Sequence, residues 1–322
     1  MQAIVSTEYG SPERLRLEEV DKPALEPDGV LIRVRAASVN PLDWHLLRGE
    51  PYIGRLMGMG LLRPSDARTG VDTAGTIEAI GENVTGLQPG DEVFGRCNGA
   101  FAEYALGTAE TVVAKPARLT FEEAAAIPVA GVTALQALRD SGAVQSGHRV
   151  LINGAAGGVG TFAVQIAKSF GAHVTGVCST RNVELLRSIG ADEVVDYSVD
   201  DFSRTEQAYD VILDTVGNRS LRALRRALVP NGTLVVVGGG GGRLFGPITQ
   251  LARAFVLGRF VRQQVKPVMA HIRRADLLVL KELVDEGKLT PVLDRTYPLS
   301  ETAEAVRYLE GGHARGKVVI TV

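Results

Sequence analysis

The sequence predicts an α/β protein in which a parallel sheet with helices on both faces is joined to a second, β-rich part. Two differences along the chain carry this prediction. From about residue 122 onward, short apolar runs alternate with amphipathic helical stretches, which is the pattern of a doubly wound parallel sheet. Residues 1–120 instead carry short runs of alternating apolar and polar residues between glycines and prolines, which is typical of an antiparallel β-rich domain.

Four runs support the β-rich part. In GVLIRVRAAS (29–38), Val30, Ile32 and Val34 fall on one face with charged residues between them, as expected for a half-buried strand. Further short strands, each bounded by a turn, are predicted in TAGTIEAIG (73–81), GDEVFG (90–95) and FAEYAL (101–106).

The second part is predicted to contain five strands and an additional edge strand. After Pro267 a helix with Leu277, Leu280 and Val284 on one face is expected, ending near Gly287. The last 35 residues return to short strands, which we expect to rejoin the first domain. The strands of the parallel sheet are predicted at 148–154, 173–179, 193–197, 209–217, 233–239 and, at an edge, 259–267.

Composition restricts the kind of partner. The chain has 322 residues, 45% of them apolar and 22% charged, which are ordinary values for a globular protein with a buried core. The formal net charge of −2 shows no basic excess, so we expect a small molecule rather than nucleic acid as the partner. Two cysteines build no disulfide framework. The N-terminus lacks a signal-peptide pattern and the charge-free stretch 150–167 is interrupted by glycines, so a cytoplasmic protein without membrane insertion is predicted.

The most informative segment is GAAGGVG at 154–160, here called the glycine-rich turn. It follows an apolar run and opens an amphipathic helix. A dinucleotide pyrophosphate needs backbone N–H groups close to its oxygens, and side chains on the turn would block that approach. The N-terminus of the helix adds the positive end of its dipole. This context predicts dinucleotide binding, and the alternative is an ordinary tight turn with small-residue packing. The predicted contacts are Gly154, Gly157, Gly158, Val159 and Gly160.

The end of the second strand bears on which cofactor binds. Enzymes that use NAD tend to place a carboxylate there, about 20 residues after the turn, to bond the ribose 2′-hydroxyl. This chain has Ser179 at that position, followed by Arg181. A hydroxyl and a guanidinium accept a 2′-phosphate, which a carboxylate would repel, so NADPH is favoured. The alternative is that Arg181 is a solvated charge at the start of a helix.

With these residues in view, the chain resembles the zinc-independent quinone oxidoreductases of the medium-chain dehydrogenase/reductase superfamily over essentially its whole length. The resemblance implies a GroES-like catalytic domain of residues 1–121 and 268–322 around a Rossmann cofactor-binding domain of residues 122–267, with the active cleft between them. It also implies a homodimer joined through the edge strand near 259–267. The motifs that carry it are ASVNPLDWHLLRG (37–49), TGVDTAGTIEAIGENV (69–84), PGDEVFG (89–95), GAFAEYA (99–105), AAAIPVAGVTALQAL (124–138), LINGAAGGVG (151–160), GADEVVDY (190–197), ILDTVG (212–217) and HARGKVVITV (313–322).

The resemblance also implies site residues. Asn40 and Asp43 resemble residues beside the nicotinamide, and Thr133 resembles a residue that contacts this ring or its ribose. Asn40 and Asp43 equally fit an Asx-type turn after the strand. Tyr197 resembles a tyrosine near the adenosine ribose phosphate, and it equally fits an ordinary tyrosine at a strand end. Further cofactor contacts are implied at Val237, Gly238 and Lys317.

No metal site is predicted. Compared with zinc-dependent relatives, this chain has Asn40 in place of the first cysteine ligand and Val71 and Asp72 in place of a His-Glu pair. Hydride transfer without a Lewis acid suits acceptors that are already activated, such as quinones and α,β-unsaturated carbonyls. A proton donor is not evident, and Tyr52 and water are the two candidates. Tyr52 lies in an apolar stretch, 45–68, that is either a substrate wall or a loop that packs on the β-domain or meets a partner.

The sequence thus predicts an NADPH-dependent oxidoreductase that reduces small hydrophobic quinones or enones. Two alternatives stay open. One is a reductase of another carbonyl compound. The other is a non-catalytic NADPH-binding protein with a partner-binding role, because a fold does not fix a function.

Overall fold

A computed structural model describes residues 1–50, 52, 54–55, 60–204, 208–237 and 262–322. The chain divides into two compact units, each described here by itself. The first, unit 1, contains Met1–Val132, Ile272–Glu286 and Pro291–Val322, and unit 2 contains Thr133–His271 and Gly287–Thr290. The sequence placed the divisions at 121/122 and 267/268. The segment after 121 lies in unit 1 because helix α2 (Phe121–Ala125) packs on strands of its sheet.

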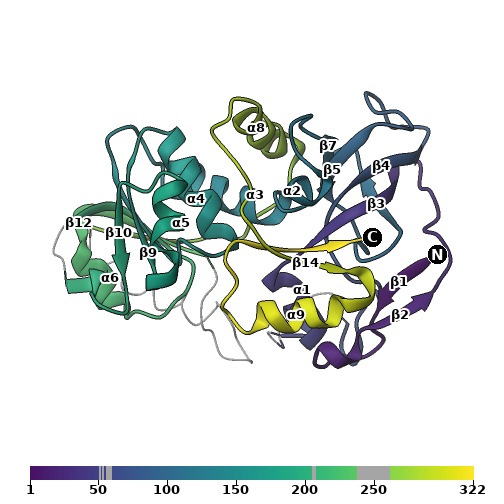
Figure 1. The fold of residues 1–322 in the computed structure, drawn as a ribbon, viewed down its shortest axis with the longest axis horizontal. Coiled ribbons are helices and arrows are strands. Elements are labelled where there is room, and N and C mark those ends of the chain that lie inside the picture. The colour runs from purple at the N-terminus through teal and green to yellow at the C-terminus, as the bar shows by residue number, and fades with distance from the viewer. Residues whose placement is uncertain (51, 53, 56–59, 205–207, 238–261) are drawn as a thin grey trace. The chain divides into compact units, whose positions relative to one another are not determined.

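Unit 1 is built on a largely antiparallel sheet, as the alternating runs predict (Figure 1). Strand β3 is its longest strand and pairs with three others, so it forms the centre of the sheet. One strand from near the C-terminus pairs directly with β3, and a second pairs with that strand in parallel. In sheet order the strands are β14 (Leu293–Pro298), β15 (Lys317–Thr321), β3 (Gly29–Val39), β4 (Asp72–Ile80), β5 (Glu92–Arg96) and β7 (Val112–Ala114), and β6 (Tyr104–Thr108) also pairs with β3.

Two helices of unit 1 depart from the sequence prediction. Residues 45–48, assigned to a loop, belong to helix α1 (Pro41–Arg48), which begins with a proline and ends at Gly49 in the left-handed conformation. Residues 302–310, expected among short strands, form α9 (Thr302–Glu310), whose buried face packs on β15. The predicted helix after Pro267 is present as α8 (Arg274–Asp285). The remaining elements of unit 1 are β1 (Gln2–Val5), β2 (Arg16–Glu19), η1 (Pro12–Arg14) and η6 (Leu299–Glu301).

Unit 2 is a doubly wound parallel sheet, so the predicted fold class is confirmed. Chain order runs outward from β8 in both directions, which places the topological switch point between β8 and β11. Right-handed crossovers then put the helices after β8 and β9 on one face and α6 (Leu221–Ala227) on the other. In sheet order the strands are β10 (Glu193–Asp196), β9 (His173–Cys178), β8 (Arg149–Asn153), β11 (Tyr209–Asp214), β12 (Leu228–Val236) and β13 (Gln264–Pro267).

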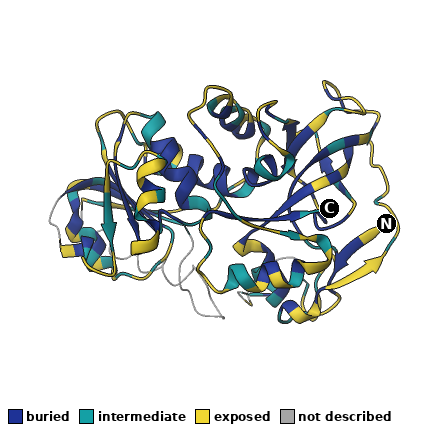
Figure 2. Cartoon of the chain, viewed as in Figure 1, coloured by how far each residue is buried: buried dark blue, intermediate teal, exposed yellow. Residues whose placement is uncertain are grey.

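Helix α4 (Gly158–Ser169) is buried on more than the one face that its apolar spacing predicts. It packs on β8 and β9, and beside the expected Ala163, Ile166 and Ala167 every other residue of 160–167 is buried as well. Figure 2 shows the inner strands of the sheet as buried and the loops as exposed. Within the described residues, no helix combines the length and apolar character needed to cross a bilayer. Helix α3 (Pro128–Gln136) begins in unit 1 and ends in unit 2. The other helical elements of unit 2 are η3 (Ala137–Ser141), η4 (Thr180–Asn182), α5 (Val183–Ser188) and η5 (Phe202–Arg204).

Candidate active site

The glycine-rich turn joins the end of β8 to the start of α4. Gly154 has φ +85°, and a Cβ there would lie 2.4 Å from the Thr215 hydroxyl oxygen. A Cβ at Gly160 would lie 2.1 Å from the Gly154 carbonyl oxygen, so the helix packs directly on the turn. These two glycines are therefore required by the fold itself.

Gly157 differs from these two glycines. It is the N-cap of α4 with an ordinary φ of −84°, and the nearest atom to a Cβ there is the Gly154 carbonyl oxygen at 3.4 Å, a normal contact. The protein itself thus has room for a side chain at this position. No side chain caps the N-terminus of this twelve-residue helix, and N–H groups in the first turn of such a helix can bind an anion. The residues of the turn fit a dinucleotide pyrophosphate.

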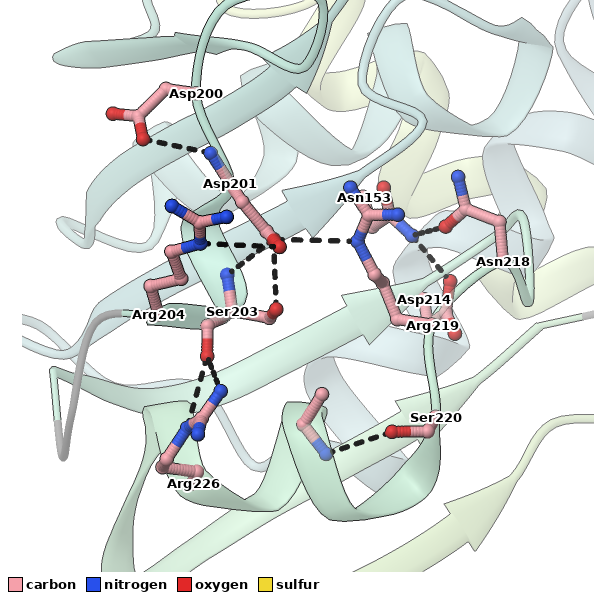
Figure 3. A network of polar contacts seen from close by, with 11 residues as sticks. Asn153, Asp200, Asp201, Ser203, Arg204, Asp214, Asn218, Arg219, Ser220 and Arg226 are labelled. Atoms are coloured by element: carbon pink, nitrogen blue, oxygen red, sulfur yellow. Dashed lines mark hydrogen bonds and ion pairs between the residues drawn. The ribbon is translucent and has the colours of Figure 1, made fainter.

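A polar contact that the sequence analysis missed links the carboxyl ends of β8 and β11, at the switch point (Figure 3). The Asn153 side-chain amide donates to Asp214 Oδ1 at 2.8 Å and to Asn218 Oδ1 at 3.0 Å. The same Asp214 oxygen accepts the Gly217 N–H at 2.9 Å, and the Thr215 hydroxyl donates to the Asn153 carbonyl at 2.8 Å. These bonds hold the loop after β11 beside the glycine-rich turn. The sequence does hold a sign of this contact, because a polar residue, Asn153 or Asp214, ends each of the two apolar strand runs.

The neighbouring loop is held separately. Asp201 accepts from the Ser203 hydroxyl at 2.8 Å and lies 3.5 Å from the Arg219 guanidinium, at the start of the segment that leads into α6 (Figure 3). The Arg226 guanidinium of α6 donates to the Ser203 carbonyl at 2.9 Å. The loop after β10 is thereby tied to α6, on the side of the sheet away from the glycine-rich turn's helix.

The residues predicted to recognise the adenosine side lie at the carboxyl ends of two adjacent strands. Ser179 follows β9 and is the N-cap of η4, which contains the exposed Arg181. Tyr197 follows β10, is about half exposed, and donates its backbone N–H to the Cys178 carbonyl at 3.0 Å. The structure thus brings Ser179, Arg181 and Tyr197 to one edge of the sheet. Asp196, which the sequence analysis did not consider, is at the same edge, and a hydrogen bond from the Thr180 side chain holds its pKa below the usual range.

Two further predicted contacts follow β12. Val237 donates its N–H to the Asp214 carbonyl at 2.9 Å, which places it at the carboxyl edge of the sheet next to the loop after β11. Gly238 lies outside the described residues.

The predicted nicotinamide contacts in unit 1 are brought together with residues that sequence reasoning did not place. We call Ser38, Asn40, Asp43, Asp72 and Lys317 the buried polar cluster; the last four are 1%, 7%, 0% and 3% exposed, in that order. Lys317 Nζ donates to Asn40 Oδ1 at 2.6 Å. Asn40 Nδ2 donates to Asp72 Oδ2 at 2.9 Å, and the Asn40 backbone N–H donates to Asp43 Oδ2 at 2.7 Å. Asn40 and Asp43 therefore also have a local structural role, because their hydrogen bond forms the turn at the start of α1.

The charges of the cluster perturb one another at close range. Burial raises the pKa of Asp43 to about 7, against the opposing effect of the Asn40 N–H, and the nearby Asp72 raises it further. Burial also raises the pKa of Asp72 and lowers that of Lys317, and the attraction between these two groups, 3.6 Å apart, opposes both changes. Asp43 Oδ1 is buried without a hydrogen-bond partner. A carboxyl group with these properties keeps its proton up to neutral pH.

Thr133 and Tyr52, two further predicted site residues, lie on α3 and in the segment after α1. Thr133 is a buried residue of α3. Tyr52 is 39% exposed, and the Arg55 guanidinium lies 4.7 Å from its ring centroid and 4.2 Å from that of Tyr9. Arg55 also donates to the Gly49 carbonyl at 2.9 Å, so these contacts hold the chain just after α1.

The metal donors of the described residues do not fit zinc. No group of three or more His, Cys, Asp and Glu side chains in that part of the chain is arranged to hold a metal ion. Cys97 packs in the apolar core of unit 1, and the His45 ring stacks on Trp44 with centroids 3.6 Å apart. A four-coordinate zinc site needs ligands that converge, which these residues do not do.

Comparison with known proteins places the chain. Residues 26–117 match the family model described as alcohol dehydrogenase GroES-like domain, and residues 189–320 match the one described as zinc-binding dehydrogenase. The mouse (Mus musculus) protein named NAD(P)H oxidoreductase RTN4IP1, mitochondrial, is 36% identical, with 100% of this chain and 89% of the relative covered. The chain belongs to the quinone oxidoreductase family of the medium-chain dehydrogenase/reductases.

Two further similar proteins agree with this assignment. The tomato (Solanum lycopersicum) protein named 2-methylene-furan-3-one reductase is 35% identical, with 99% of this chain and 79% of the relative covered. The solved structure of the quinone oxidoreductase from Coxiella burnetii has a TM-score of 0.86 and 31% identity, and covers 100% of this chain and 99% of that one. The chain is therefore an NAD(P)H-dependent oxidoreductase, and the alternative of a non-catalytic binding protein is not supported.

Proposed function

We propose that this oxidoreductase transfers hydride from NADPH to small hydrophobic quinones or α,β-unsaturated carbonyl compounds, and that it does so without zinc. The observation that carries the cofactor part is Gly157, a glycine at a helix N-terminus that the fold does not require. A ligand that approaches the backbone closely explains its presence. The name of the mouse relative includes NAD(P)H, which supports a nicotinamide cofactor.

The preference for NADPH rests on Ser179 and Arg181. Neither residue repels a 2′-phosphate, and a guanidinium binds phosphate through paired N–H groups. Asp196 at the next strand end acts against this preference, because its carboxylate is charged. Its acceptor oxygens bond the Thr180 side chain and, at 2.9 Å, the Ser198 N–H, so the loop stabilises the charged carboxylate and occupies part of its hydrogen-bonding capacity. NADPH supplies the hydride when it is bound, and these residues select it by its phosphate.

The proposed class of hydride acceptor rests on the exposed apolar side chains near α1 and on the replacement of the zinc ligands. Helix α1 and the segment after it present exposed apolar side chains: Leu42, Leu46, Leu61 and Leu62, the last 88% exposed. Such side chains exclude water around an apolar ring or chain. Since the zinc ligands found in alcohol dehydrogenases are replaced here, an acceptor with its own electron-poor double bond is the substrate that this chain suits. The proton that completes the reduction comes from Tyr52 or from water.

The test follows NADPH absorbance, as a loss with a panel of quinones and a panel of enones, and as a gain with a panel of simple primary alcohols and NADP⁺. We expect turnover with the first two panels and little with the third. With an enone, deuterium from nicotinamide C4 is expected on the product's β-carbon. Turnover of saturated aldehydes or ketones alone would favour the alternative of a reductase for another carbonyl compound.

A homodimer joined through the edge strand β13, and a cytoplasmic location, belong to the same proposal. Within the described residues β13 is the outermost strand of its sheet, so one of its edges is open to pairing. Analytical ultracentrifugation measures the oligomeric state directly, and a sedimenting mass of one chain would exclude the dimer.

A further inference from the structure

The side-chain amide of Asn40 is held in one orientation by partners of opposite chemistry. An amide offers two donors and one acceptor oxygen, and a rotation of 180° about its last bond interchanges them. Asp72 only accepts, and it receives Asn40 Nδ2 at 2.9 Å. Lys317 only donates, and its ammonium reaches Asn40 Oδ1 at 2.6 Å. A rotated amide would place its oxygen against a carboxylate and its hydrogens against an ammonium group.

Asp72 is bonded by more than Asn40. Its Oδ2 also accepts the Ser38 hydroxyl at 3.0 Å and lies 3.6 Å from Lys317 Nζ. Its Oδ1 accepts the Val129 N–H at 3.1 Å. Four donors, from the ends of β3 and β15 and from helix α3, therefore meet one carboxylate that is fully buried. Only a group that accepts on both atoms satisfies all of them, because buried donors without acceptors are costly.

The contact with Val129 connects the cluster to another predicted nicotinamide contact. Val129 lies in the first turn of α3, where a carboxylate also interacts favourably with the helix dipole. Thr133 is four residues further on in the same helix, one turn away on the same face. Asp72 thus bonds Asn40 directly and fixes the start of the helix that carries Thr133.

We propose that Asp72 is a positioning residue for hydride transfer, which holds the Asn40 amide in its functional orientation and fixes the N-terminal turn of the helix that carries Thr133. The proposal rests on the function proposed above. Asp72 itself touches neither cofactor nor acceptor; it acts through Asn40 and Val129.

The main variant is Asp72→Asn. The new side chain keeps an acceptor for the Val129 N–H but turns an NH2 group toward the Ser38 hydroxyl, Asn40 Nδ2 and Lys317. We expect kcat, normalised to the concentration of NADPH-binding sites, to fall about 10- to 100-fold, the range that a small misplacement of reacting groups produces. The Kd for NADPH is expected to change less than about threefold, because the glycine-rich turn and Arg181 are untouched. A merely structural role would lower the number of binding sites and leave kcat per site unchanged, which would overturn the proposal.

The matched control is Thr73→Val, at a fully buried residue next to Asp72 that lies outside the buried polar cluster and whose hydroxyl has no hydrogen-bond partner. We expect a Tm close to that of the wild type and a kcat per site within about twofold of it. A loss of kcat as large as that of Asp72→Asn would show that any change in this part of β4 has this effect, and would also overturn the proposal.

The double variant Asn40→Asp/Asp72→Asn keeps one carboxylate and one amide in the cluster but interchanges them. Lys317 still meets an acceptor, and the Val129 N–H still meets the oxygen of residue 72. We expect the Tm to return to within a few degrees of the wild type while kcat per site stays low, since the amide at 40 is gone. If Asp72→Asn alone does not fold, the double variant is used as the test in its place. Recovery of kcat together with Tm in the double variant would refute the proposal. A wild type that reduces no acceptor would instead overturn the proposed function.

Discussion

The buried carboxyl of Asp43 makes a sharp prediction about stability and pH. Its pKa is raised from 3.8 to about 7, first by burial and then by the nearby Asp72. In the unfolded chain this carboxyl ionises near pH 4, while in the folded protein it keeps its proton to about pH 7. Between these values the folded state binds more protons, so the free energy of unfolding falls as the pH rises. A pKa difference of about 3 corresponds to at most about 4 kcal/mol.

The perturbation is Asp43→Asn, which cannot ionise and still offers an oxygen to the Asn40 N–H. Urea unfolding of both proteins at a series of pH values from 4.5 to 8 gives a difference curve from which the other titrating groups largely cancel. We expect the wild type to lose up to about 4 kcal/mol relative to the variant over this range, with the loss complete slightly above pH 7. A flat difference curve, or one in which the wild type gains stability with rising pH, would refute the assignment of a buried, protonated Asp43.

The remaining predictions concern the cofactor and metal. Gly160→Ala places a methyl group 2.1 Å from a carbonyl oxygen and is expected to lower the Tm strongly. Gly157→Ala is expected to lower the free energy of unfolding by about 1 kcal/mol or less and yet to weaken NADPH binding at least tenfold. Equal losses of Tm in the two variants would contradict this difference. Arg181→Ala is expected to weaken NADPH binding about 10- to 150-fold with little effect on NADH binding, and Asp196→Asn is expected to strengthen NADPH binding. Both effects are measured by titration with the cofactor. A wild type that binds NADPH and NADH equally would end the argument for a phosphate contact. Prolonged dialysis against a chelator is expected to change neither Tm nor activity, and about one zinc per chain by elemental analysis would contradict the donor-set argument.

The sequence predicted the parallel sheet well because its evidence is local. Each strand of unit 2 is a short apolar run with a helix or turn beside it, and the glycine-rich turn has its chemistry within seven residues. Helix α1 was missed although Asn40, Pro41 and Gly49 are start and stop signals, because the apolar residues after 45 looked like part of a long loop.

The parts of the site that escaped prediction depend on residues far apart in the chain. Asp72 bonds Asn40 across 32 positions and Val129 across 57, and Asn153 bonds Asp214 across 61. A polar residue at the end of an apolar run is visible in a sequence, but its partner is set by which strands become neighbours. Asp72 was noted only as a substitute for a metal ligand, and its four donors appear only once β3, β4, β15 and α3 are assembled.

The position of β15 in the sheet has a consequence for how the chain folds during synthesis. Lys317, the cation of the buried polar cluster, is made 277 residues after Asn40, so at 5–20 residues per second roughly 14 to 55 s separate them on the ribosome. During that interval Asp72 has no counter-charge and β3 lacks β15 along part of one edge, whereas the strands of unit 2 have all been made by residue 267. Unit 2 is therefore expected to become protease-resistant on nascent chains that stop before Lys317, while unit 1 is expected to stay open to proteases and chaperones until β15 arrives.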